Sequence, residues 1–307
     1  MAVPDYQSVM FPLLSFAQER KEEISTDDVV SALSVKLGLT EDELKEMLPS
    51  GLQGTFANRV GWAATYMKKA GLLEPTRRGY YRITQRGQEL LKKNPAKINV
   101  KLLKQYPEFL AFQQLKGTRS GGKTSAERDA IEISTATPSE ALENAYENLR
   151  DELVDELLTK LKRLSPSFFE RIVVELLVKM GYGGSRADAG QAIGKAGDEG
   201  IDGVISEDRL GLDIVYLQAK RWEGSVGRPE IQKFVGALHG KRAKKGVFIT
   251  TGSFSSDAAA YVEHIDPKVV LIDGRRLAEL MIDFEVGVTT ARTFHVKRVD
   301  SDYFEEG

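Results

Sequence analysis

Residues 194–221, GKAGDEGIDGVISEDRLGLDIVYLQAKR, decide the fold of the C-terminal half of this chain. A loop rich in glycine and acidic residues leads into a short strand over 201–205. A polar turn follows, and then an apolar strand over 214–219 that ends in charged residues. Two such strands joined by a turn of polar residues and glycine predict a β-hairpin.

The hairpin carries three residues that suit phosphodiester chemistry. Gln218 and Lys220 lie two residues apart on the second strand, so their side chains are expected to leave the same face. Pairing of the strands would bring Asp202 to the same edge of the sheet. A carboxylate and an amide oxygen suit a hard divalent cation, and an ammonium suits a phosphate. We therefore predict a catalytic site of Asp202, Gln218 and Lys220, although a surface turn with ordinary charges would also explain a lone Q-x-K.

The pattern G-D-x-G-I-D-G over 197–203, followed by Q-A-K over 218–220, resembles the Mrr-type branch of the PD-(D/E)xK nucleases. In that branch glutamine replaces the usual acid of the second half-motif. The order of a helix, a glycine-rich turn at 181–184, strands, Q-x-K, a helix and the apolar strand 246–251 is similar to that of the Mrr catalytic domain. Residues 1–94 resemble the Mrr winged-helix domain.

This resemblance implies an α/β restriction-endonuclease-like C-terminal domain with a mixed sheet and a mainly α winged-helix N-terminal domain. It also implies Mg²⁺-dependent cleavage of methylated double-stranded DNA, a role in host defence, and a homo-oligomer. The expected domains are a winged helix (1–94), a linker (95–139), a nuclease domain (140–290) and a C-terminal tail (291–307).

Two further acids are candidates for the site. The resemblance implies that the helix over 168–180 lends Glu170 to the active site, whereas an acid near a helix start also simply complements the helix dipole. Asp198, four residues before Asp202, is predicted as a secondary metal ligand beside Asp202 and Gln218, or as a DNA contact. Because Gln218 lacks the charge of an acid, we expect weaker metal binding and no second metal unless Glu170 or Asp198 compensates.

The N-terminal region combines helices with a basic hairpin. Helical periodicity over 6–19, 26–37 and 56–70 precedes a strand, a tight turn and a strand over 72–84, which is the order of a winged helix. Residues 55–93 hold nine basic residues against two acidic ones, a net charge of +7 that suits phosphate contacts. The alternative is a helical core with a solvated basic surface. The predicted DNA contacts are Arg59, Lys68, Lys69, Arg77 and Arg78.

Composition excludes several classes of protein. The chain has 307 residues, of which 41% are apolar and 29% charged, and its net charge is -2, so we expect about two ordinary globular domains. It has no cysteine, which excludes disulfides and thiolate zinc sites, and only three histidines. We find no apolar run of about 18 residues and no signal-peptide pattern, and so we expect a cytoplasmic protein without a membrane partner.

Two other functions stay open at this stage. A non-catalytic DNA-binding regulator with a degenerate nuclease domain would explain Gln218, although it would not need both Asp202 and Lys220. A junction resolvase-like nuclease would share the nuclease fold, although it would not need a winged helix for duplex binding.

Overall fold

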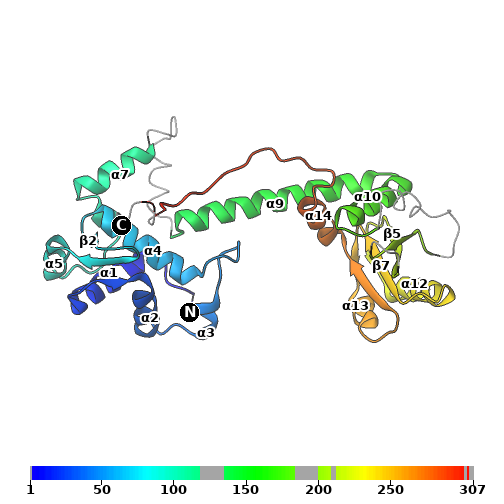
Figure 1. Cartoon of the computed structure of the whole chain (residues 1–307), viewed down its shortest axis with the longest axis horizontal. Helices are drawn as coiled ribbons and strands as arrows, with labels where there is room; N and C mark the ends of the chain where they lie inside the picture. The colour runs from blue at the N-terminus through cyan, green and yellow to red at the C-terminus, as the bar shows by residue number, and fades with distance from the viewer. Residues whose placement is uncertain (1, 118–134, 184–199, 209–211, 301–302, 304–307) are drawn as a thin grey trace. The chain divides into compact units, whose positions relative to one another are not determined.

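The computed structural model describes residues 2–117, 135–183, 200–208, 212–300 and 303 (Figure 1). The chain divides into two compact units, residues 1–148 with 298–307 and residues 149–297. The boundary falls inside one helix, α9 (Pro138–Arg163). The two units are described separately.

The first unit is mainly helical. Its helices and strands, in order, are α1 (Tyr6–Arg20), β1 (Ile24–Ser25), α2 (Thr26–Lys36), α3 (Glu41–Lys45), α4 (Thr55–Lys69), β2 (Leu73–Pro75), β3 (Tyr80–Ile83), α5 (Gln85–Lys92), α6 (Val100–Leu103) and α7 (Pro107–Gly117). The helix starts follow local sequence signals, because Asp5 caps α1 and capping boxes at Ser25 and Thr40 begin α2 and α3. The apolar faces of α1, α2 and α4 then pack into one hydrophobic core.

A small antiparallel sheet of order β1-β3-β2 completes this unit. The β2–β3 hairpin has Glu74 opposite Arg82, and its turn contains Gly79 at a φ of +75°. Glycine is favoured there because other residues rarely adopt a positive φ. The strand, turn and strand predicted over 72–84 are therefore present, with Arg77 and Arg78 at the tip of the turn.

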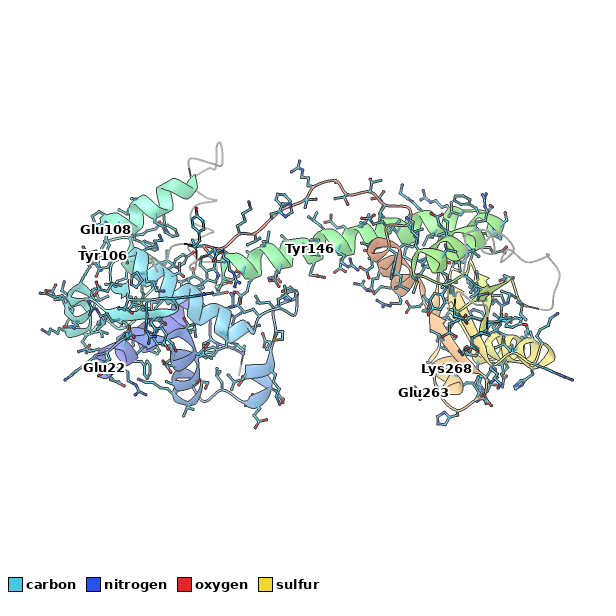
Figure 2. The ribbon with its side chains drawn as sticks, viewed as in Figure 1. Glu22, Tyr106, Glu108, Tyr146, Glu263 and Lys268 are labelled. Carbon is cyan, nitrogen blue, oxygen red and sulfur yellow. The ribbon has the colours of Figure 1, made fainter. Side chains whose placement is uncertain are left out.

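Part of the segment predicted as a linker is folded onto this unit. Ile98, Val100, Leu103 and Phe109 are buried in the same core as α1 and α4. Arg86 of α5 pairs with Glu108 of α7, and its guanidinium also lies 5.2 Å from the ring of Tyr106; Figure 2 labels both of these partners. Proline content suggested a linker, but Pro107 begins α7, a position that proline tolerates well.

The second unit is α/β. After α9 its elements are α10 (Pro166–Lys179), β4 (Gly203–Ser206), β5 (Ile214–Lys220), β6 (Ser225–Val226), α12 (Arg228–Gly240), β7 (Lys245–Thr250), β8 (Ser253–Phe254), α13 (Ser256–Val262), β9 (Lys268–Ile272) and α14 (Gly274–Asp283). The main sheet has the order β4-β5-β7-β9. The β4–β5 pair is antiparallel and the other two pairs are parallel, so the predicted hairpin and mixed sheet are confirmed.

Helices cover both faces of this sheet (Figure 1). Leu217 and Ile249 point to one face, where α9, α10 and α14 pack. Phe248 points to the other face, which α12 and α13 cover. A strand that is covered on both faces has a nearly continuous apolar sequence, and β7 is an example.

The helix that carries Glu170 begins earlier than the sequence suggested. Ser165 is the N-cap of α10, because its side chain accepts a hydrogen bond from the backbone N–H of Phe168. Pro166 then occupies the first turn of the helix.

Within the part of the chain that the structure describes, no helix is long and apolar enough to cross a membrane.

Candidate active site

The β4–β5 hairpin fixes the position of Asp202. This residue directly precedes β4, and its backbone N–H donates to the carbonyl of Leu217 at 2.8 Å. One carboxylate oxygen, Oδ2, accepts a hydrogen bond from the backbone N–H of Ala219, also at 2.8 Å. The carboxylate is therefore tied to the end of β5, as the sequence predicted for a hairpin.

Gln218 is on β5, next to Asp202 of the neighbouring chain segment. Its side chain is on the face opposite to Leu217 and is 8% exposed. Gly200 passes over its amide group, so that a β-carbon at this position would lie 3.5 Å from Nε2. The φ of Gly200 is +98°, which other residues rarely adopt. One glycine of the G-D-x-G-I-D-G pattern thus lets the backbone cover the Gln218 amide.

Lys220 shares the face of Gln218 and reaches across to α12. Its Nζ donates to Oε2 of Glu230, and Lys233 donates to Oε1 of the same carboxylate at 2.7 Å. The Lys220 ammonium also lies 4.8 Å from the centre of the Trp222 ring. Lys220 therefore ends between a carboxylate and an aromatic face.

Glu170 contributes a second acid near Asp202. Partial burial raises the pKa of the Glu170 carboxyl, and repulsion from the Asp202 carboxylate raises it further. Burial also raises the pKa of Asp202, while the Ala219 N–H and the Lys220 charge act in the opposite direction. Both carboxyl groups are therefore harder to ionise than an exposed carboxyl group would be.

These donors fit a divalent cation. A divalent cation held by Asp202 and Glu170 would favour the ionised form of both carboxyls, and Gln218 offers an amide oxygen of the kind that hard cations accept. Within the described residues no group of three histidine, cysteine, aspartate or glutamate side chains is placed to hold a metal. The third oxygen donor here is an amide, and the predicted ligand Asp198 lies outside the described residues.

Arg59, predicted as a DNA contact, has its guanidinium inside the first unit. Nε pairs with the carboxylate of Glu140 at 2.6 Å, and Nη1 donates to the carbonyl of Val3 at 2.5 Å. The Arg59 side chain is 20% exposed and that of Glu140 only 7%. Arg59 joins the start of α9 to α4, and we do not retain it as a DNA contact.

The other predicted DNA contacts lie at the surface to different degrees. Lys68 is half-buried with its ammonium 4.4 Å from the Tyr81 ring, and this burial lowers its pKa. Lys69, Arg77 and Arg78 are exposed. Arg77 pairs with Glu23 at 2.6 Å.

Glu140 and Glu230 have structural roles that the sequence patterns did not predict. Glu140 accepts from the backbone N–H of Thr137, whose hydroxyl accepts from the N–H of Glu140. This is a capping box, and the sequence T-P-S-E over 137–140 signals it. Glu230 pairs with Lys220 from a helix ten residues further along, and no local pattern predicts that contact.

Comparison with known proteins decides the family. Residues 161–281 match the restriction endonuclease family, and residues 6–93 match the Mrr N-terminal domain. The chain is 40% identical over 312 residues to the type IV methyl-directed restriction enzyme EcoKMrr of Escherichia coli (strain K12), an alignment that covers 99% of this chain and 100% of that protein. The chain belongs to the Mrr family of restriction endonucleases. It is accordingly a DNA endonuclease, and residues 161–281 form its nuclease domain.

One solved structure matches this chain, but the structural similarity is weak. The MspJI restriction endonuclease in complex with a 27-mer oligonucleotide is 24% identical and superposes with a TM-score of 0.28. The match covers 53% of this chain and 34% of the MspJI chain. The assignment to the Mrr family rests on the sequence matches and not on this overlap.

Proposed function

We propose that this Mrr-family nuclease cleaves methylated double-stranded DNA in a Mg²⁺-dependent reaction at Asp202, Gln218 and Lys220. The observation that carries the proposal is the convergence of these residues at one end of the β4–β5 hairpin. The methyl-directed activity belongs to the 40% identical E. coli enzyme, which aligns over nearly the whole chain.

Asp202 and Gln218 would hold the cation, and Glu170, whose pKa the Asp202 charge raises, would add a second carboxylate. Hydrogen bonding of Asp202 to the Ala219 N–H keeps its carboxylate orientation fixed. A bound Mg²⁺ supplies Lewis-acid chemistry and lowers the pKa of a coordinated water. The site offers mainly oxygen donors, as Mg²⁺ prefers.

Lys220 faces the scissile phosphate in this proposal. Its ammonium offsets the negative charge that grows on the phosphate as water attacks, and it donates hydrogen bonds to the phosphate oxygens. Gln218 keeps the metal site less negative than an acid would, so Asp202 and Glu170 supply its negative charge, which is little for two divalent cations. We propose a single catalytic cation for this reason.

The first unit would bind the duplex as a winged helix. Support comes from the element order, from the β2–β3 hairpin, and from the exposed cations Lys69, Arg77 and Arg78 beside the partly buried Lys68. Such cations contact phosphates and so position a protein without reading sequence. Because one site cuts one strand, we propose that two copies act together on a duplex, in the cytoplasm where the DNA lies.

Methylated plasmid is expected to be cut faster than unmethylated plasmid, by about tenfold or more, because each well-placed contact to a modified base contributes roughly 1–3 kcal/mol of discrimination. The measurement is the initial rate of supercoiled plasmid loss with Mg²⁺ present, using one plasmid prepared with and without methylation. Equal rates would refute methyl recognition while leaving the nuclease intact. Binding without any cutting would instead support a DNA-binding regulator.

A further inference from the structure

We propose that Glu230 is the positioning residue for Lys220, so that cutting requires the carboxylate on α12 as well as the residues of the hairpin. This inference rests on the proposed function of Lys220. It concerns a residue outside the G-D-x-G-I-D-G and Q-x-K patterns.

Glu230 is well placed to fix another side chain. It lies in the first turn of α12, where Pro229 restricts the backbone. The next residue, Ile231, and Phe234 are fully buried against the sheet, so the start of this helix is held by the core. The Glu230 side chain is 20% exposed, and its two oxygens bind two different lysines.

Lys220 needs such a support. A lysine side chain has four rotatable bonds and a compact charge, so it does not hold one position unless contacts confine it. Here Glu230 binds the ammonium, and the Trp222 ring lies 4.8 Å away from it. An ammonium has three donors, so the Glu230 contact leaves donors for a phosphate.

The net charge of Lys220, Lys233 and Glu230 is compatible with Glu230 positioning Lys220 for phosphate binding. Lys220 and Lys233 share one carboxylate, so the three side chains together keep one positive charge toward the DNA. Hydrogen bonds from Lys220 and then from Lys233 lower the pKa of Glu230, which keeps this carboxylate ionised at neutral pH. Glu230 is thus able to fix the position of Lys220 without cancelling the attraction for phosphate.

The test is the kcat and KM of full-length Glu230→Gln on methylated plasmid with Mg²⁺, compared with wild type. We expect kcat to fall about tenfold, the change that 1.4 kcal/mol of lost transition-state stabilisation produces. KM should stay equal or fall, because the variant removes a negative charge near the DNA. A merely structural role would not lower kcat while leaving or improving KM.

Three companion variants make the result decisive. Glu230→Asp keeps the charge on a shorter side chain and should give an intermediate kcat. Glu263→Gln makes the same change at the exposed end of α13, labelled in Figure 2, and should behave as wild type. Adding Glu230→Gln to Lys220→Ala should cause no further loss of kcat, because the two residues act through one group.

The outcomes separate this inference from the proposed function. Unchanged kcat in Glu230→Gln, beside an active wild type and a Lys220→Ala variant with a much lower but measurable kcat, would overturn the positioning role alone. A faster Glu230→Gln would overturn it too, since the contact would then restrain Lys220. A Lys220→Ala variant as active as wild type, or an inactive wild type, would overturn the proposed function and with it this inference.

Discussion

Asp202→Asn is expected to lower the rate of DNA cutting by about 10³-fold or more. The Asp202 carboxylate is the proposed anionic ligand of the cation, and metal catalysis supplies several kcal/mol of charge stabilisation in the transition state. The asparagine amide oxygen can still accept the hydrogen bond from the Ala219 N–H, so the hairpin should keep its geometry. Burial raises the pKa of Asp202, so loss of its charge should not destabilise the protein.

Single-turnover cutting rates, measured beside DNA affinity and thermal unfolding, check this prediction. Asp213→Asn is the matched control, because it changes an exposed aspartate at the other end of the same hairpin, where its partner is Lys245. An exposed pair of this kind contributes little to stability, so the control should cut at the wild-type rate. Wild-type rates in Asp202→Asn would refute the site.

Arg59→Ala is expected to lower the free energy of unfolding of the first unit by about 3–5 kcal/mol, the usual cost of leaving one partner of a buried ion pair alone. Glu140 is only 7% exposed and would lose the 2.6 Å contact to its ion-pair partner. The substitution also removes the donor to the carbonyl of Val3. The start of α9 should therefore loosen together with the N-terminal residues.

Chemical denaturation of the full-length protein measures this loss, with Lys69→Ala as the control. Lys69 is exposed on the same helix and is one of the proposed DNA contacts, so its replacement should weaken DNA binding while stability changes by less than about 0.5 kcal/mol. If Arg59→Ala were as stable as Lys69→Ala and lost DNA affinity instead, Arg59 would be a DNA contact after all.

The hairpin that carries the site was predictable because its signals are local. Alternation along β5 sends Gln218 and Lys220 to one face, and the antiparallel pairing of β4 with β5 brings Asp202 to Ala219. The parallel strands β7 and β9 were predictable from short apolar runs between helices.

The remaining features depend on contacts distant in sequence. The sequence predicts Arg59 as a DNA contact, but its ion-pair partner Glu140 is 81 residues away. Residues 95–112 looked like a linker, yet Ile98 and Phe109 complete a core that only the folded helices create. Glu230 pairs with Lys220 because α12 packs on the face of the sheet to which Lys220 points, and the packing of that helix is a tertiary property.

The most direct test of the proposed mechanism is the rate of methylated-plasmid cutting by the wild-type protein, first without added metal in the presence of a chelator and then with excess Mg²⁺. We expect no cutting with the chelator and restored cutting with Mg²⁺, because Asp202, Gln218 and Glu170 would hold the cation, and the bound cation would supply the Lewis-acid chemistry of the reaction. Equal cutting under both conditions would contradict the proposed metal site and the roles assigned to Asp202 and Gln218.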